Sequence, residues 1–97
     1  MNSESAVAAL GALAQTTRLA TMELLVRSEP AGLSAGDIAR RLGVTQNTLS
    51  GHLSILRRGG MVLAQRNSRS IIYRANVGEV LALLSYLGSL GPPILKT

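Results

Sequence analysis

The chain has 97 residues, the length of one small domain, so two independently folded domains do not fit. Hydrophobic residues make up 46% of it and charged residues 15%. This balance excludes a disordered polymer, and the absence of cysteine excludes disulfides, thiol nucleophiles and thiolate metal sites. The formal net charge is +5, and all but one of the ten basic residues is arginine, which favours an anionic partner.

Two helices are predicted before Pro30. The first covers about residues 5–14, with Ser3 or Ser5 as its cap and with apolar side chains at helical spacing, namely Val7, Leu10 and Ala14. The second begins near Thr16 and ends before Pro30, because the residue before a proline disfavours the helical conformation. Its apolar stripe consists of Leu19, Met22, Leu25 and Val26.

A pair of helices joined by a short turn is predicted between residues 34 and 59. Ser34 caps the first helix, and Asp37 occupies the third helical position. Gly43 suits the left-handed turn that ends a helix, and Thr45 caps the second helix, which covers residues 46–58. One side of this second helix is predicted to be buried, because its leucines follow the spacing i, i+4, i+7: Leu49, Leu53 and Leu56.

After Met61 the hydrophobic period changes from helical to two, which predicts a two-stranded ribbon over residues 61–75 with a turn at Asn67-Ser68. The last segment, from Val77 to about Leu90, is apolar almost all round. Such a helix does not lie on a free surface, and it is too short to span a membrane. We expect it to pack against another subunit, since a chain this small and this apolar has more apolar surface than one core can bury.

These elements predict a mostly α fold of about five helices with a two-stranded β-wing, the winged helix-turn-helix architecture. We expect a single domain over residues 1–97. Its expected parts are dimerisation helices within 1–15 and 77–95, a helix-turn-helix at 34–59 and a wing at 61–75.

The outward face of the 46–58 helix carries the groups that bind nucleic acid. Amides and hydroxyls there, those of Gln46, Asn47 and Ser50, are of the kind that pair with base edges in a major groove. No Asp or Glu lies between Ile38 and Gly78, while seven of the arginines do. A solvated basic face and a solvated hairpin are the alternatives for these arginines, and His52 is interpreted as a helix side chain that satisfies a neighbouring polar group.

Three segments together resemble the ArsR-type (arsenic-repressor) family of winged-helix transcriptional regulators. They are LAQTTRLATMELL at 13–25, LSAGDIARRLGVTQNTLSGHLSILRRGGMV at 33–62 and RNSRSIIYRA at 66–75. The residues on the family's frequent positions are Ser50, His52, Leu53, Leu56, Gly60, Tyr73 and Arg74. The resemblance implies a homodimeric repressor that binds double-stranded DNA at an inverted repeat, with half-sites about one helical turn or a small multiple apart.

The resemblance also implies roles for individual residues. The dimer interface is expected at Val7, Leu10, Val80, Leu84 and Leu87. Contacts to the DNA backbone, from the helix-turn-helix or the wing, are expected from Arg40, Thr45, Thr48, Ser54, Arg57, Arg66, Asn67 and Arg69.

Three departures from the family pattern change the expectations. Gly51 stands where a large polar residue is frequent, so base contacts fall on Gln46, Asn47 and Ser50. The cap of the second helix comes from Gln15 or Thr16 instead of Asp-Pro. Metal-sensing members use cysteines or Asp and His pairs, whereas this chain has no cysteine and one histidine, His52. We therefore expect no metal, no cofactor and no thiol switch, which leaves the effector open.

The leading hypothesis is a sequence-specific DNA-binding regulator. A winged-helix module that binds only proteins is the alternative, although such a face usually carries aromatic or aliphatic anchors. An enzyme is not expected, since Ser50 and His52 point to different sides of their helix and no catalytic set is present. The start of the chain shows no clear export segment and no apolar stretch reaches the ~18 residues of a membrane span, so we expect a cytoplasmic protein.

Overall fold

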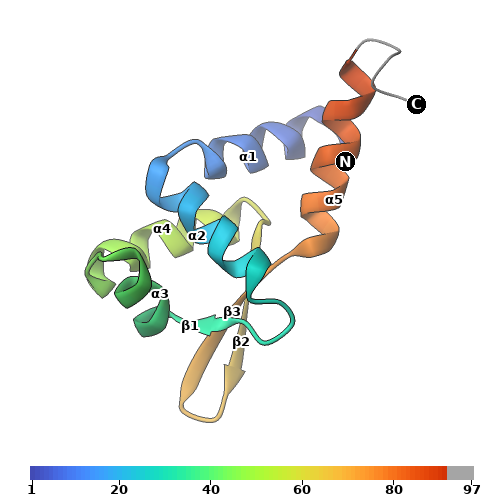
Figure 1. Cartoon of the computed structure of the whole chain (residues 1–97). Coiled ribbons are helices and arrows are strands. Elements are labelled where there is room, and N and C mark those ends of the chain that lie inside the picture. The colour runs from blue at the N-terminus through green and yellow to red at the C-terminus, as the bar shows by residue number, and fades with distance from the viewer. Residues whose placement is uncertain (92–97) are drawn as a thin grey trace.

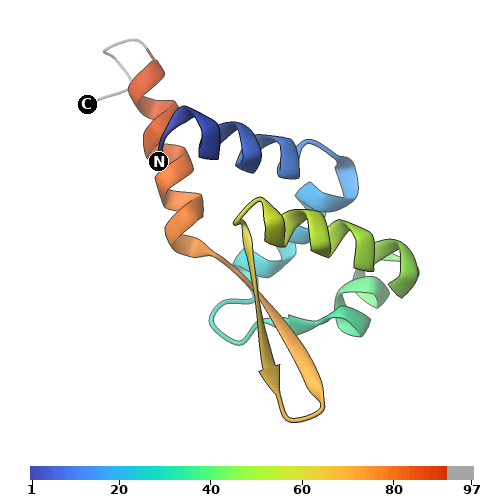
Figure 2. The ribbon, with the colours of Figure 1, turned by 180° about the vertical axis from the view of Figure 1, so that it is seen from behind.

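The computed structural model describes residues 1–91, which form five helices and three strands. The helices are α1 (Ser3–Leu13), α2 (Thr16–Arg27), α3 (Ala35–Leu42), α4 (Gln46–Arg58) and α5 (Val77–Leu90). The strands are β1 (Leu33–Ser34), β2 (Val62–Asn67) and β3 (Ser70–Ala75). The β2–β3 hairpin and the end of α5 project from opposite ends of the helical body (Figures 1 and 2). Residues 92–95 of the predicted C-terminal dimerisation segment lie outside the described residues.

The first helix begins earlier in the chain than expected and has a different cap, whereas the second helix has one of its two expected caps. Asn2, not a serine, caps α1: its side-chain oxygen accepts a hydrogen bond from the Ser5 backbone N–H at 2.8 Å, and the Ser5 hydroxyl accepts one from the Asn2 backbone at 3.1 Å. This reciprocal pair lets the helix start at Ser3. Gln15 caps α2 by accepting from the Arg18 backbone N–H at 2.9 Å.

The helix-turn-helix forms as the local sequence predicts. The Ser34 hydroxyl accepts from the backbone N–H of Asp37 at 3.2 Å, and the Thr45 hydroxyl accepts from that of Thr48 at 3.2 Å. Gly43 ends α3 with a φ of 70°, a left-handed conformation that costs a side-chain-bearing residue free energy. The sharp turn between the two helices therefore depends on Gly43.

The sheet has three strands instead of the predicted two. The extra strand, β1, pairs antiparallel with β3 through Leu33 opposite Tyr73, and the strand order is β1-β3-β2. Two residues carry no detectable period, so this strand could not be predicted from the local sequence. The hairpin turn also lies one residue later than expected: Asn67 pairs with Ser70, and Ser68 adopts a φ of 59° in the loop.

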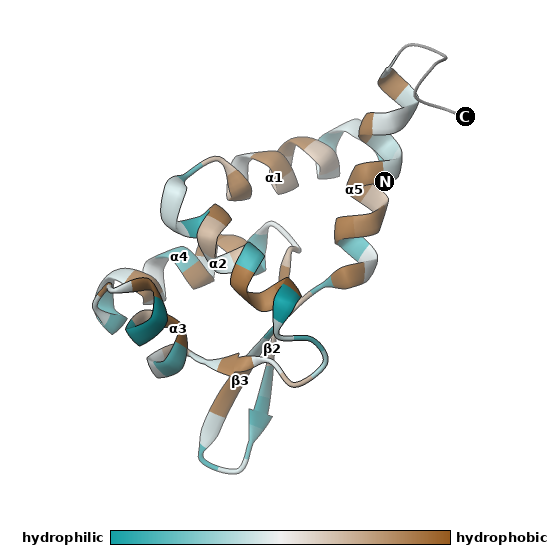
Figure 3. Cartoon of the chain, viewed as in Figure 1, coloured by the Kyte–Doolittle hydropathy of each residue, from teal (hydrophilic) through white to brown (hydrophobic). Residues whose placement is uncertain are grey.

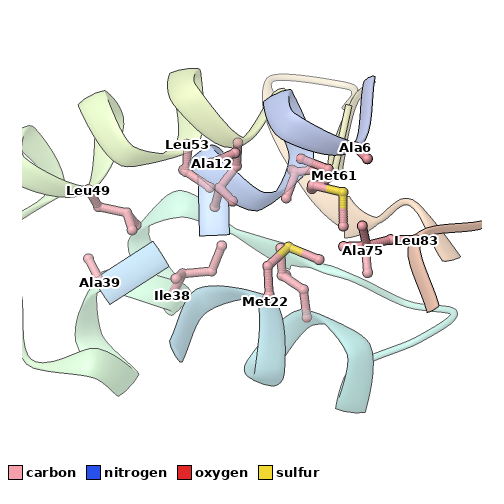
Figure 4. Packing of buried hydrophobic residues seen from close by; sticks show 14 residues of the cluster. Ala6, Ala12, Met22, Ile38, Ala39, Leu49, Leu53, Met61, Ala75 and Leu83 are labelled. Carbon is pink, nitrogen blue, oxygen red and sulfur yellow. The ribbon is translucent and has the colours of Figure 1, made fainter. Parts of the chain in front are cut away.

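The core lies between α1, α2, α3, α4 and the base of the wing, and small residues on α1 let that helix approach the others closely (Figure 4). The fully buried large side chains include Leu25, Ile38, Leu49, Leu53, Leu56 and Met61. In the predicted α2 stripe, Met22 and Leu25 are buried whereas Leu19 and Val26 remain exposed. α2 is therefore only partly covered within one protomer.

Candidate nucleic-acid interface

The outward face of α4 presents a row of exposed polar and small side chains. Because Leu49, Leu53 and Leu56 are buried on the opposite side, helical geometry turns the remaining positions toward solvent. Those exposed positions include the three residues predicted to contact bases and two small residues that follow them on α4: Gln46, Asn47, Ser50, Gly51 and Ser54. The predicted exposure of this face is confirmed.

The N-terminus of α4 is built to face an anion. Thr45 caps it, and the Thr45 hydroxyl also donates to the Thr48 hydroxyl at 3.0 Å. The first turn contains no acidic residue, so the partial positive charge of the helix end is not offset there. The side-chain amide of Gln46 lies beside Gly36 of α3: its Nε2 would be 3.3 Å from a Cβ placed on Gly36. The Gln46 side chain must move away from α3 before its amide can contact a base.

A groove of about 370 Å³ joins the second half of α4 to the wing. Polar and cationic side chains line most of it, with Leu53 and Tyr73 as its apolar members: Ser50, Leu53, Ser54, Arg57, Arg58 and Tyr73. Guanidinium groups in such a groove match phosphate oxygens in two-point contacts. Arg58 was not among the predicted contact residues, although its place one residue after Arg57 in an acid-free segment could have indicated it.

The wing extends the basic surface away from the helices. Arg66, Asn67 and Arg69 are all exposed near the tip of the hairpin, and the hydropathy colouring shows this tip as hydrophilic (Figure 3). Within residues 1–91, no ion pair engages Arg57, Arg66 or Arg69. Their charge therefore remains available to an external anion.

Two other arginines in the basic segment are already paired. Arg40 contacts Asp37 one helical turn earlier at 2.8 Å, and its hydrogen bond holds the pKa of the Asp37 carboxyl below its usual value. Arg74 contacts Glu29 at 2.6 Å. Arg40 was predicted to contact the DNA backbone. Its side chain is still 69% exposed, but its charge is shared with an internal partner.

His52 has the structural role that its sequence context indicated. Its Nδ1 lies 3.2 Å from Nη1 of Arg18, on α2, and the ring is half-buried. The sequence did not identify Arg18 as the partner, since the two residues are 34 positions apart and no local pattern connects them.

Hydrophobic residues recur along α1 and α5 (Figure 3), and several of their large apolar side chains are exposed in the protomer. Of the residues predicted at the dimer interface, Val7 is 69% exposed and Leu84 61%, Leu10 and Leu87 are also exposed, and Val80 is half-buried. Val80 and Leu84 also line an apolar groove of about 380 Å³ between α2 and α5, which continues through the exposed Leu19 and Val26. Contiguous apolar surface of this kind marks an interaction site.

Residues 1–91 contain neither a cluster of metal ligands nor a helix suited to cross a membrane. No group of three or more His, Cys, Asp or Glu residues gathers there in a way that could hold a metal ion. Over the same range, no helix is both long enough and apolar enough to cross a membrane.

The fold and this surface define a winged helix-turn-helix DNA-binding protein, and comparisons with known proteins agree. A helix-turn-helix domain family matches residues 13–65. The transcriptional activator HlyU of Vibrio cholerae is 36% identical over 86 residues, covering 89% of this chain and 77% of that protein. The structure of an ArsR-like transcriptional regulator from Rhodococcus sp. RHA1 superposes with a TM-score of 0.80 at 28% identity, covering 91% of this chain and 80% of that one.

A homodimeric winged helix-turn-helix DNA-binding domain from Mycobacterium bovis also superposes, with a TM-score of 0.71 at 27% identity, covering 89% of this chain and 80% of that one. The chain belongs to the ArsR family of winged helix-turn-helix transcriptional regulators. It is a DNA-binding transcriptional regulator, and the alternative of a module that binds only proteins is not supported. The relatives HlyU and the Rhodococcus protein are regulators of transcription.

Proposed function

We propose that the protein is a homodimeric repressor that binds an inverted-repeat operator without a metal or thiol switch. Each protomer inserts α4 into the major groove, where Gln46, Asn47 and Ser50 contact bases. The wing reaches the DNA backbone or the adjacent minor groove. Two-fold symmetry sets the half-sites about one helical turn, or a small multiple of it, apart.

One observation supports this proposal most strongly: an exposed polar face on α4 lies beside arginines that form no ion pair within residues 1–91. Asn47 and Ser50 are exposed and face away from the leucines of the core. The groove between α4 and β3 supplies Arg57, and the hairpin supplies Arg66 and Arg69. Polar groups on a helix can specify bases while the flanking cations position the duplex.

The exposed apolar surface supports the dimer. Val7 and Leu10 on α1, together with Leu84 and Leu87 on α5, expose more apolar surface than an isolated protomer of this size is expected to keep in water. The solved Mycobacterium bovis relative is a homodimer. A dimer that buries these side chains between its two protomers carries two α4 helices, one from each protomer.

The 97-residue sequence contains no cysteine, so it offers no thiol for a redox switch. Its one histidine, His52, already contacts Arg18 through Nδ1. We therefore propose that DNA binding does not depend on a bound metal ion. Repression follows if the operator overlaps a promoter, since a bound dimer then excludes polymerase. Such a protein acts where its operator is, in keeping with the predicted cytoplasmic location.

The test is selection of bound fragments from a genomic DNA library with the purified protein at moderate salt, in the presence and absence of a chelator. The proposal expects one enriched inverted-repeat motif, unchanged by the chelator. A pool with no motif would contradict sequence-specific binding, and a motif without internal symmetry would contradict the dimer. A motif that appears only without chelator would contradict metal independence. Transcription from a promoter carrying the motif then reports the direction of regulation.

A further inference from the structure

Arg18 lies where three helices meet, and its side chain connects two of them to its own. It belongs to the first turn of α2. Its Nε donates a hydrogen bond to the backbone oxygen of Ala12 at 2.6 Å, near the end of α1, and its Nη1 lies 3.2 Å from Nδ1 of His52, in the middle of α4. Arg18 is half-buried and both contacts are partly shielded from solvent, so water competes less well for them.

The contact with Arg18 orients the imidazole of His52. A guanidinium only donates hydrogen bonds, so Nδ1 of His52 is the acceptor in this contact. The planar guanidinium of Arg18 thus contacts the Ala12 carbonyl of α1 and the His52 side chain of α4 at the same time. Its N–H groups point in fixed, different directions, which allows both contacts.

Besides the bridge through Arg18, α4 packs directly against the same part of α1 at Gly59. A Cβ placed on Gly59, just after α4, would lie 2.6 Å from the Cβ of Ala12 and 3.2 Å from the backbone oxygen of Ala8. The two helices therefore approach as closely as glycine allows. α4 is held to α1 at its C-terminal end by this packing, and in its middle by the bridge from Ala12 through Arg18 to His52.

We propose that Arg18 is a positioning residue that fixes the recognition helix α4 relative to the dimerisation helix α1. The inference rests on the proposed function, in which α1 contributes to the dimer interface and α4 enters the DNA. Since α1 is then fixed relative to the symmetry axis, the bridge sets the separation and tilt of the two α4 helices. Arg18 and His52 thereby determine which half-site spacing the dimer accepts, although neither side chain contacts a base.

The test compares half-site spacing preferences. The operator found by selection is prepared with one base pair added or removed between its half-sites, and affinities are measured for the wild type, His52→Ala and His52→Asn. The amide oxygen of asparagine can take the place of Nδ1 as an acceptor. We expect the wild type and His52→Asn to prefer the natural spacing by about tenfold or more. We expect His52→Ala to lose most of that preference while its affinity for a single half-site is unchanged.

The controls separate this inference from stability and from the proposed function. Thermal unfolding and sedimentation are run on every variant, and Arg18→Lys, which cannot span both contacts, replaces His52→Ala if that variant does not fold at the assay temperature. Unchanged spacing preference in the variant, or an equal loss of affinity on all spacings and on the single half-site, would overturn the positioning role alone. A wild type that shows no preferred spacing would overturn the proposed symmetric dimer, and this inference with it.

Discussion

Arg74 on β3 and Glu29, just after α2, form a two-point ion pair across the base of the wing. Nη2 of Arg74 donates to Oε1 of Glu29 at 2.6 Å, and Nε donates to Oε2 at 3.1 Å. This pair ties the hairpin to the helical body, so Arg74 anchors the wing instead of extending the DNA-binding surface. The hydrogen bonds from Arg74 hold the pKa of the Glu29 carboxyl below its usual value, and they raise the pKa of the Arg74 guanidinium.

Replacement of Glu29 by glutamine is expected to destabilise the protein in a pH-dependent manner. The lowered pKa means that the native state favours the ionised carboxylate. Its contribution is therefore fully present above about pH 4.5, the ordinary value, and is lost as the pH falls through the lowered pKa. Urea unfolding midpoints of wild type and Glu29→Gln should differ at pH 7 and converge at the lowest pH at which both still fold. An equal difference at both pH values would contradict the assigned role of the ion pair.

Substitution by alanine is expected to have opposite effects on the free energy of unfolding at Gly51 and at Gly43. Gly51 lies inside α4, and a Cβ there meets nothing within 4 Å, so Gly51→Ala should raise the free energy of unfolding by up to about 1 kcal/mol through helix propensity. A Cβ at Gly43 also meets nothing within 4 Å, but its φ is +70°, so Gly43→Ala should lower that free energy by about 1 kcal/mol. Denaturant unfolding of both variants measures the two signs. A loss of stability in Gly51→Ala would show that the outer face of α4 is more crowded than the structure indicates.

The dimer interface can be tested by a charge placed on α5. Leu84 is 61% exposed in the protomer, and burial of an unpaired carboxylate in an apolar interface is strongly unfavourable. Leu84→Glu should therefore yield monomers in sedimentation equilibrium at concentrations where the wild type is dimeric. Leu63→Glu, at a 50% exposed leucine on the wing, is the matched control and should remain dimeric. Monomers from the control, or dimers from Leu84→Glu, would place the interface elsewhere.

The wing arginines are expected to contribute affinity without specificity. Arg66→Ala or Arg69→Ala should weaken binding to all DNA sequences alike. Removal of one arginine–phosphate interaction should reduce the slope of log affinity against log salt by about one. Arg27→Ala removes an arginine that is also exposed, at the end of α2, and should leave the slope unchanged. Titrations at four or five salt concentrations measure the slopes, and identical slopes for Arg69→Ala and Arg27→Ala would remove the wing from the DNA interface.

Much of the fold follows from local chemistry and could therefore be predicted from the sequence. Ser34, Thr45 and Gly43 specify the ends of α3 and α4 through caps and a left-handed turn, and each acts within a few residues of itself. The exposure of Asn47 and Ser50 follows from the same 3.6-residue period that buries Leu49 and its neighbours. These features need no knowledge of distant parts of the chain.

Features that depend on distant residues could not be predicted in this way. The strand β1 exists because Leu33 pairs with Tyr73, and a two-residue segment has no pattern of its own. The partners Arg18 and His52, and likewise Glu29 and Arg74, are brought together only by packing of the helices and the sheet. The hairpin turn lies one residue later than predicted because Ser68, not Asn67, adopts the positive φ.

Placement of α4 in the major groove, with Asn47 against the bases, determines which DNA sequences the protein prefers. The affinity of wild type and Asn47→Ala is therefore measured for the selected operator and for each single-base substitution of one half-site. We expect the variant to lose about 1–3 kcal/mol on the operator and to stop discriminating at one or two adjacent positions, while its preferences elsewhere persist. A variant that keeps the wild-type preference at every position, or that loses affinity equally on all sequences, would contradict this placement.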